Sequence, residues 1–350
     1  MKNLLDSYDY LSDLDSVVLN SNFQKLDGAS VLITGAYGMI ASFLIDCLMY
    51  YNIYKGGHIK IFAISRSRDK SLQRFGMYSS HPLMNFLYMD VTQPLNININ
   101  FDIIIHAASN AHPLAFATNP VDTMKANLLG TINLLEYAVH HNSKRFIFFS
   151  STEVYGQNES SFNNPLIESA IGNVDINNVR ASYPESKRAG EVLCMAYKEQ
   201  YGINTVSIRP GYIYGPTMTM DSTKADVQFI RKAILGEDIV LKSEALNIRS
   251  YCYVSDCADA IFQILFNGKD NSYNIGGADI ASIREFAEIA AKIAGVKIIF
   301  EVAGDVEKKG YSTFMNGIIS NHRINAIGYN PRVCLNDGIS RTIGILKTVT

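Results

Sequence analysis

The sequence lacks the features that would place the protein in a membrane or on nucleic acid. No uninterrupted apolar run reaches the roughly 18 residues that a membrane-spanning helix needs. The 31 basic and 33 acidic residues nearly cancel, to a formal charge of −2. A balance of this kind creates no strong field that attracts nucleic acid or an anionic membrane surface. We therefore expect a protein that binds neither.

Patterns typical of disulfide frameworks, metal sites and export signals are also missing. The five cysteines are odd in number and show no CxxC spacing, and the seven histidines show no metal-binding spacing. The stretch 1–20 is acidic and contains no continuous apolar run, which does not fit a secretory signal. These absences predict a cytoplasmic protein with reduced, mostly buried thiols and no bound metal.

The chain does contain short apolar runs that alternate with amphipathic helical stretches. Helical patterns cover 38–51, 119–141 and 183–201. The apolar runs read as strands buried on both faces, and they are SVLITG (30–35), IKIFAIS (59–65), NFLYMDV (85–91), DIIIHAA (102–108), RFIFFSS (145–151) and NTVSIRP (204–210). This alternation predicts an α/β fold, a Rossmann-type doubly wound parallel sheet with helices on both faces.

The pattern changes after residue 210, which predicts a second and smaller α/β region that binds substrate. We expect a helical N-terminal extension over 1–27 and a dinucleotide-binding domain over 28–210. Elements at about 251–277 are expected to return to the main sheet. The substrate-binding region would then consist of 211–250 and 278–350.

The first predicted strand ends in TGAYGMIA, which spaces Gly35, Gly38 and Ala41 as G-x-x-G-x-x-A. Glycines at these places let the backbone turn sharply into a helix and approach a pyrophosphate. The alternative is a tight strand-to-helix turn of an ordinary α/β protein. Because the motif follows the first buried strand and opens a helix, it favours dinucleotide binding. The candidate contacts here are Gly35, Tyr37, Gly38, Met39 and Ile40.

The next strand ends mark further cofactor contacts. The second strand is followed by SRSRDK, with no acidic residue at its tip for an adenosine ribose. Arg66 and Arg68 could instead accept a 2′-phosphate, which slightly favours NADP over NAD, although a solvated basic loop explains them equally simply. Asp90 and Val91 follow the third strand, and the small residues Ala107, Ala108 and Ser109 follow the fourth.

The segment YPESK places Tyr183 and Lys187 four residues apart on one face of a predicted helix. A phenol titrates near 10, so it needs a neighbouring positive charge to act as a base at neutral pH. Ser151, at the tip of the fifth strand, would orient a substrate alcohol beside it. By itself, the pair also fits a half-buried tyrosine with a lysine that reaches to solvent.

The order of the motifs is more specific than any one of them. TGAYGMIA, HAAS, KANLLGTINLLEYA, FFSSTEVYG, YPESK and RPGYIYGP occur in the order found in extended short-chain dehydrogenase/reductases that modify nucleotide sugars. The chain resembles that family over about residues 28–300, and most of all its UDP-glucuronate decarboxylases and 4,6-dehydratases. The resemblance implies a tightly bound nicotinamide cofactor, NAD or NADP, and transient oxidation at the C4 carbon of a nucleotide-linked sugar.

The resemblance also implies roles for single residues. Ser151 would hydrogen-bond the C4 hydroxyl, Tyr183 would remove its proton, and Lys187 would hold Tyr183 and the nicotinamide ribose. Asn127 matches the asparagine that stabilises the bend near the active site. Pro210 matches the loop that touches the nicotinamide amide.

Glu153 separates the possible reactions. A C4 ketone acidifies the C5 hydrogen and turns a C5 carboxylate into a β-keto acid that can lose CO₂. In 4,6-dehydratases a glutamate at this position takes the C5 proton, often beside an aspartate, where this chain has Thr152. Simple 4-epimerases need no such glutamate. The alternative for Glu153 is a surface carboxylate at a strand end.

Substrate contacts are expected from Thr152, Arg180, Lys224 and Arg249. Arg249 resembles the arginine that meets the diphosphate in these families, and Lys224 lies where an arginine often binds phosphate. Arg180 could meet a substrate carboxylate or form a salt bridge in solvent.

The leading prediction is therefore a nucleotide-sugar enzyme that oxidises C4 and acts at C5, with UDP-glucuronate decarboxylation first. A 4,6-dehydratase or an epimerase is the alternative, and a non-catalytic dinucleotide-sensing scaffold is an alternative of another class. The family also implies a homodimer formed through the helices at about 119–141 and 183–201.

Overall fold

A parallel sheet of seven strands forms the centre of the computed structural model, which describes residues 3–110, 118–157, 164–301 and 316–349. The strand order is β3-β2-β1-β4-β5-β6-β10, and every neighbouring pair is parallel. The strands are β1 (Ser30–Thr34), β2 (Lys60–Ser65), β3 (Met84–Tyr88), β4 (Ile103–His106), β5 (Arg145–Phe149), β6 (Thr205–Pro210) and β10 (Ser272–Ile275). This confirms the predicted Rossmann-type fold.

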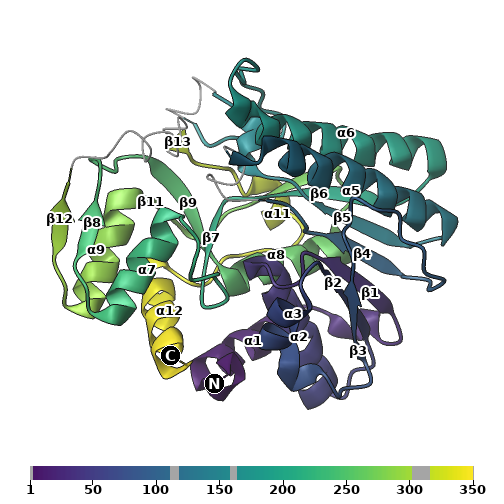
Figure 1. Ribbon diagram of the computed structural model, residues 1–350, viewed down its shortest axis with the longest axis horizontal. Helices are drawn as coiled ribbons and strands as arrows, with labels where there is room; N and C mark the ends of the chain where they lie inside the picture. The colour runs from purple at the N-terminus through teal and green to yellow at the C-terminus, as the bar shows by residue number, and fades with distance from the viewer. Residues whose placement is uncertain (1–2, 111–117, 158–163, 302–315, 350) are drawn as a thin grey trace.

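The strands are apolar throughout because helices cover both faces of the sheet. Val31 and Ile33 of β1 pack into the core on one face, with α1 (Tyr8–Asn20), α2 (Met39–Tyr54) and α8 (Val254–Asn267). Leu32 packs into the core on the other face, with α5 (Pro120–His140) and α6 (Ser182–Tyr201). Figure 1 shows α5 and α6 side by side above the sheet and α1 and α2 below it. Successive side chains of a strand point to opposite faces of the sheet. Because both faces are covered by helices, both sets of side chains are apolar, and the strands do not alternate between apolar and polar residues.

A second region packs beside the carboxyl ends of the main sheet and has its own core. Its largest sheet pairs β9 (Ile248–Tyr253) with β7 (Tyr212–Tyr214), β11 (Asp279–Ser282) and β13 (Asn316–Gly317). A smaller sheet joins β8 (Ile239–Leu241) to β12 (Ile298–Phe300). The helices are α7 (Ala225–Leu235), α9 (Ile283–Ala294) and α12 (Leu335–Val349). Figure 1 shows these helices grouped on the side of the molecule away from α6.

The expected return to the main sheet at 251–277 begins later than predicted. Residues 251–253 belong to β9 in the second sheet, and only α8 and β10 join the main one. The sequence gives no sign of the boundary between β9 and α8, because both elements are buried and form one continuous apolar run. Of the predicted substrate-binding region, 302–315 and 350 lie outside the described residues.

The N-terminal extension fastens the two regions together. Its helix α1 carries the buried Asp13, whose carboxylate accepts a hydrogen bond of 2.6 Å from the Tyr253 hydroxyl of β9. The same carboxylate lies 2.9 Å from Arg341 Nη1 of α12. Shorter helices complete the described chain: α3 (Arg68–Phe75), α11 (His322–Asn325), and 3-10 turns at Leu4–Asp6, Phe23–Leu26, Gly76–Tyr78, Thr152–Tyr155 and Val179–Ala181.

Candidate active site

A cavity of about 1640 Å³ runs along the carboxyl ends of the main strands and into the second region. Most of the predicted site residues line it, namely Gly35, Tyr37, Gly38, Met39, Ile40, Arg66, Asp90, Val91, Ala107, Ala108, Ser109, Ser151, Thr152, Glu153, Tyr183, Lys187, Pro210, Lys224 and Arg249. Arg68, Asn127 and Arg180 do not. Ligands of open α/β sheets bind at this edge, so the cavity is the candidate site.

One end of the cavity, formed by the turn 35–40 and by Arg66, Asp90 and 107–109, is called the cofactor end. Gly35 has φ +66°, and a Cβ there would lie 2.8 Å from Ala108 Cα. Glycine is thus required both by the left-handed backbone and by the close approach of β4. The turn leads into α2 at Gly38, so the N–H groups at the start of this helix border the cavity and favour an anion.

The cofactor end fits a dinucleotide on the chemistry of its residues. Gly35 and Gly38 line the cavity at the start of α2, so backbone N–H groups of this turn border the space that an anion would occupy. The buried Oγ of Ser109 has no hydrogen-bond partner among the described residues and lines the same cavity. Buried polar atoms in proteins are nearly always paired, so this hydroxyl is suited to a ligand.

The basic residues after β2 are placed differently from one another. Arg66 is exposed and lines the cavity, whereas Arg68 begins α3 and does not. Lys70 Nζ lies 5.6 Å from the ring centroid of Tyr37, which also lines the cofactor end. Positive charge therefore borders this part of the cavity.

Ser151, Tyr183 and Lys187 converge where β5 meets α6. Ser151 caps the 3-10 turn Thr152–Tyr155, and its hydroxyl is close enough to the Tyr183 phenol to lower the pKa of that phenol. Lys187 Nζ donates 2.6 Å to the Phe149 carbonyl and lies 5.8 Å from the Tyr183 ring centroid. The helix comes this close to the strand because Gly190 has no side chain: a Cβ there would lie 2.4 Å from the Phe148 ring.

Burial controls the charges of this group. Burial raises the pKa of Tyr183 well above its ordinary value, the Glu153 charge adds to this, and the bond from Ser151 opposes it. Burial lowers the pKa of Lys187 to about 7, although Glu191 opposes this effect. The protein alone therefore keeps the phenol protonated, and a further positive charge is needed to make it a base.

Asn127 lies beneath the cavity and supports α6 from behind. Its Nδ2 donates 2.8 Å to Ser186 Oγ, and that hydroxyl donates 2.9 Å to the Tyr183 carbonyl. Its Oδ1 is buried and has no partner among the described residues. Asn127 thus contacts the helix that carries Tyr183, and this is where the structure places the residue expected to stabilise a bend.

Glu153 shares the cavity with Tyr183 and lies among positive charges. Arg180 Nη2 is 3.4 Å from its Oε1, with the two side chains 16% and 26% exposed. Burial raises the pKa of Glu153, while Arg180, Lys224 and Arg249 each lower it. The sequence-based alternative of a surface carboxylate does not describe this residue, because it faces the candidate site.

The other end of the cavity, formed by 212, 223–232, 240–251 and Glu301, is called the substrate end. Arg249 of β9 is only 1% exposed, and its guanidinium carbon lies 4.6 Å from the Tyr212 ring centroid. Lys224 precedes α7 and lines the cavity beside Asp226, whose pKa is raised by burial and lowered by Lys224. Thr152 lines the cavity between this end and Ser151.

Several polar side chains of the substrate end were missed from the sequence. Tyr212 follows Pro210 by two residues, and this spacing is the signal that could have marked it. The rest carry no local signal, since they come from α7 and from loops that meet it only in the folded chain; they are Asp226, Gln228, Lys232, Lys242, Ser243, Asn247 and Glu301.

Known proteins resemble this chain in sequence. A family model described as the NAD dependent epimerase/dehydratase family matches residues 31–276. UDP-glucuronic acid decarboxylase 3 of Arabidopsis thaliana is 30% identical over 328 residues, which cover 93% of this chain and 90% of that protein. The chain belongs to the NAD-dependent epimerase/dehydratase family. The resemblance drawn from the motifs, and the prediction of an enzyme of this kind, are confirmed.

Solved structures show the same fold. The UDP-glucuronic acid 4-epimerase of Bacillus cereus, in complex with UDP-glucuronic acid and NAD, aligns with a TM-score of 0.75 at 20% identity, over 92% of this chain and 100% of that one. The dTDP-glucose 4,6-dehydratase of Streptomyces venezuelae with NAD bound aligns with a TM-score of 0.76 at 22% identity, over 90% and 96%. Enzymes of different activity therefore share this fold.

Among the described helices, none is both long and apolar enough to cross a membrane. In the same parts of the chain, no three His, Cys, Asp or Glu side chains are grouped so that they could hold a metal ion.

Proposed function

We propose that the protein binds NAD(P) and a nucleoside-diphosphate sugar, oxidises the sugar at C4 and acts at C5, as a UDP-glucuronate decarboxylase. The observation that carries this proposal is that Glu153, Lys224 and Arg249 line the same cavity as Ser151 and Tyr183, with Arg180 paired to Glu153. Decarboxylase relatives that align over nine tenths of the chain support the choice.

The residues of this chain divide the work at C4. When bound, the oxidised nicotinamide supplies a positive charge and accepts the C4 hydride. Ser151 hydrogen-bonds the C4 hydroxyl and Tyr183 takes its proton, since Ser151 follows β5, Tyr183 lies on α6, and both side chains line the same cavity. Lys187, held by the Phe149 carbonyl, stabilises the phenolate by Coulomb attraction.

The surroundings of Glu153 favour a substrate that carries its own carboxylate. Arg180, Lys224 and Arg249 all lower the pKa of Glu153, so one carboxylate shares three cations. A sugar carboxylate would complete this arrangement through charge-assisted hydrogen bonds. Once C4 is a ketone, that carboxylate is a β-keto acid and leaves as CO₂. Burial raises the pKa of Glu153, which favours its holding a proton for C5.

Mass spectrometry of the products tests the reaction. Purified protein is incubated with UDP-glucuronate and with dTDP-, GDP- and CDP-hexoses, with and without added NAD(P). Loss of CO₂ from UDP-glucuronate is expected. Loss of water from a hexose would identify a 4,6-dehydratase, and an isomer of unchanged mass would identify an epimerase. If no sugar nucleotide reacts, the proposal is wrong.

Arg66 makes NADP the slightly favoured cofactor within this proposal. It lines the cofactor end and is exposed, so its guanidinium can reach a 2′-phosphate. Arg66→Ser is expected to weaken NADP binding about tenfold, with NAD binding unchanged. Arg68→Ser is the matched control, because Arg68 does not line the cavity. Titration calorimetry measures both cofactors, and equal losses for NAD and NADP would contradict this role.

We also propose a homodimer formed through α5 and α6. These helices lie side by side and expose apolar side chains, among them Leu129 on α5 and Val192 and Met195 on α6. Light scattering should give twice the 38.8 kDa of one chain. Val192→Glu should yield monomers, whereas Leu235→Glu, an equally exposed position on α7, should not. A wild-type monomer would remove the proposal.

A further inference from the structure

The residues 151–153, called the catalytic turn, have weak hydrogen bonds of their own. The Glu153 N–H donates to Ser151 Oγ and the Val154 N–H donates to the Ser151 carbonyl, both at 3.2 Å. These distances are at the long end of the range for hydrogen bonds. The turn also lies at the end of a strand, where ladder bonds stop. Its position therefore depends on what holds the residues on either side.

The residue before the turn is held by Glu191. The Ser150 hydroxyl donates 2.5 Å to Glu191 Oε1, which comes from α6, one turn beyond Lys187. Glu191 in turn forms a two-pronged ion pair with Arg209 of β6, with Nε to Oε1 at 2.9 Å and Nη2 to Oε2 at 2.6 Å. Both side chains are nearly buried, at 13% and 12% exposed. A fork of this kind fixes orientation as well as distance.

Tyr155, two residues after the turn, is held by the same arginine. Arg209 Nη1 donates 3.0 Å to the Tyr155 hydroxyl, and the guanidinium lies 5.0 Å from the Tyr155 ring centroid. The Tyr155 hydroxyl donates 2.6 Å to Asn274 Oδ1 of β10. Tyr155 is completely buried, so its ring cannot shift without moving its neighbours.

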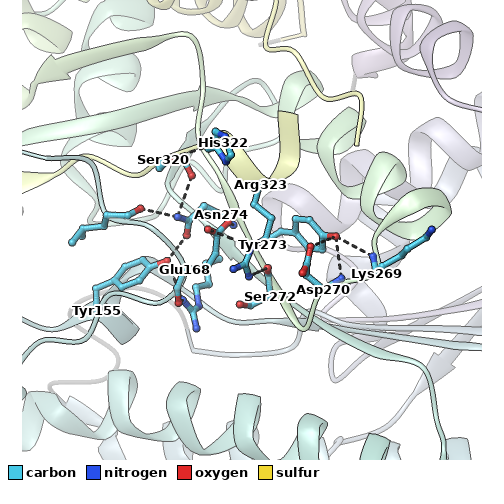
Figure 2. A network of polar contacts seen from close by, with 12 residues as sticks. Tyr155, Glu168, Lys269, Asp270, Ser272, Tyr273, Asn274, Ser320, His322 and Arg323 are labelled. Carbon is cyan, nitrogen blue, oxygen red and sulfur yellow. Dashed lines mark hydrogen bonds and ion pairs between the residues drawn. The ribbon is translucent and has the colours of Figure 1, made fainter. Parts of the chain in front are cut away.

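A second layer of bonds keeps Asn274 and Arg209 in register. Glu168 accepts 3.0 Å from the Asn274 backbone N–H through Oε1, and its carbonyl accepts 2.7 Å from Arg209 Nη1. Arg323 of α11 lies 3.8 Å from the second oxygen of Glu168. Figure 2 shows Tyr155, Glu168 and Asn274 gathered in this network, with Arg323 approaching from the other side.

We propose that the Glu191–Arg209 ion pair is a positioning device that fixes the catalytic turn from both ends, at Ser150 and at Tyr155. The role of the turn itself rests on the proposed function. A buried ion pair is weak evidence for stability, because apolar replacements are often as stable. An arrangement that uses both carboxylate oxygens and all three guanidinium nitrogens of Arg209 is better suited to fixing geometry.

Glu191→Gln tests the proposal, with Asp13→Asn as the matched control. Asp13 is also a buried carboxylate bonded to an arginine and a hydroxyl, but it joins α1 to β9 and α12, away from the catalytic turn. In Glu191→Gln, kcat should fall about 100-fold because the turn is displaced, with KM and the Kd of NAD within about twofold. In Asp13→Asn, the melting temperature should fall and kcat should stay near wild type.

Amide hydrogen exchange gives a readout that needs no substrate. In Glu191→Gln, exchange at Val154 and Gly156 should rise about tenfold, and in Asp13→Asn it should not. Faster exchange without any sugar-nucleotide activity would leave the ion pair in its role and overturn the proposed function instead. Unchanged exchange, or equal kcat for both variants, would overturn the positioning role.

Ser150→Ala provides a second variant if Glu191→Gln does not fold. It keeps the ion pair and removes one of the two attachments of the turn, so kcat should fall about fivefold with KM unchanged. Wild-type kcat in Ser150→Ala would show that the hydrogen bond from Ser150 to Glu191 does not position the catalytic turn, which would contradict the proposal.

Discussion

At the cofactor end of the cavity the lining comes mostly from backbone and small side chains at the ends of one parallel sheet. At the substrate end it comes from charged and aromatic side chains of separate segments. Gly35 and Ala108 illustrate the first kind of lining, and Arg249, Tyr212 and Lys224 the second. The first recognises a dinucleotide through backbone N–H groups and close approach. The second recognises through the identity of individual side chains.

The difference explains how one family holds several reactions. Backbone geometry changes little when surface and loop residues change, so we expect the cofactor end to vary less among relatives than the substrate end. The substrate end can change one side chain at a time. Tyr183 and Ser151 line the same cavity, and under the proposed function they act on C4 whichever sugar is bound.

The largest effect should come from Tyr183→Phe, at the junction of the two ends. Loss of the base should lower kcat at least about 1,000-fold, while Kd for NAD and for UDP-glucuronate stays within about twofold. Steady-state kinetics and calorimetry measure both. If activity survives, the proton acceptor is another group, and the cofactor end and the substrate end do not meet at Tyr183.

Gly35→Ala should break the cofactor end alone. The new Cβ would lie 2.8 Å from Ala108 Cα, on a backbone with φ +66°. Neither strand can move cheaply, so NAD affinity should fall about 100-fold by calorimetry. Gly236→Ala is the control: φ is +68° there, but no atom lies within 4 Å of the new Cβ. It should lower stability without changing NAD affinity. Equal losses of affinity would contradict the role of close approach.

Arg249→Lys should break the substrate end alone. The lysine keeps the charge, but it loses the planar contact with Tyr212 and the forked donors. KM for the sugar nucleotide should rise about 30-fold, with the Kd of NAD unchanged. A matching loss of NAD affinity would show that the two ends are not independent.

His106 of β4 sharpens the comparison, because its protonation reports whether water reaches the strands beneath the cofactor end. Burial, and then the Lys187 charge, lowers the pKa of His106 from 6.5 to about 3. Between these values the unfolded chain binds a proton that the native chain does not, so stability falls as pH falls from 6.5 toward 3. From His106 alone, the free energy of unfolding should drop about 2 kcal/mol between pH 7 and pH 5.

Urea denaturation of wild type and His106→Leu at both pH values isolates this contribution. The variant should lose about 2 kcal/mol less than wild type over the interval. Identical pH dependence would mean that native His106 reaches water and takes up its proton.

Much of the cofactor end could be predicted from local patterns. Gly35 and Gly38 stand out because a strand-to-helix turn against a neighbouring strand tolerates no side chain. Tyr183 and Lys187 share a helical face through their spacing alone. Even here, the sequence did not distinguish Arg66 from Arg68. The structure does, because Arg68 begins a helix and only Arg66 lines the cavity.

The substrate end was predicted less well for a physical reason. Asp226 at the start of a helix reads as an ordinary exposed acid, yet the fold leaves it half-buried in the cavity, where Lys224 lowers its pKa. Glu191 and Arg209 lie 18 residues apart on a helix and a strand, with nothing local to mark them as a pair. β9 reads as part of the main sheet, because buried strands of either sheet have the same apolar pattern.

The sequence by itself determined the parallel sheet, the order of its strands' motifs, and the placement of Ser151, Tyr183 and Lys187 at one edge. These follow from periodicity and backbone rules that act over a few residues. Only the tertiary structure decided that Glu153 faces three cations and that an ion pair holds the turn carrying it. Charges and hydrogen bonds between distant segments depend on where side chains meet, and that is fixed only when the two cores pack together.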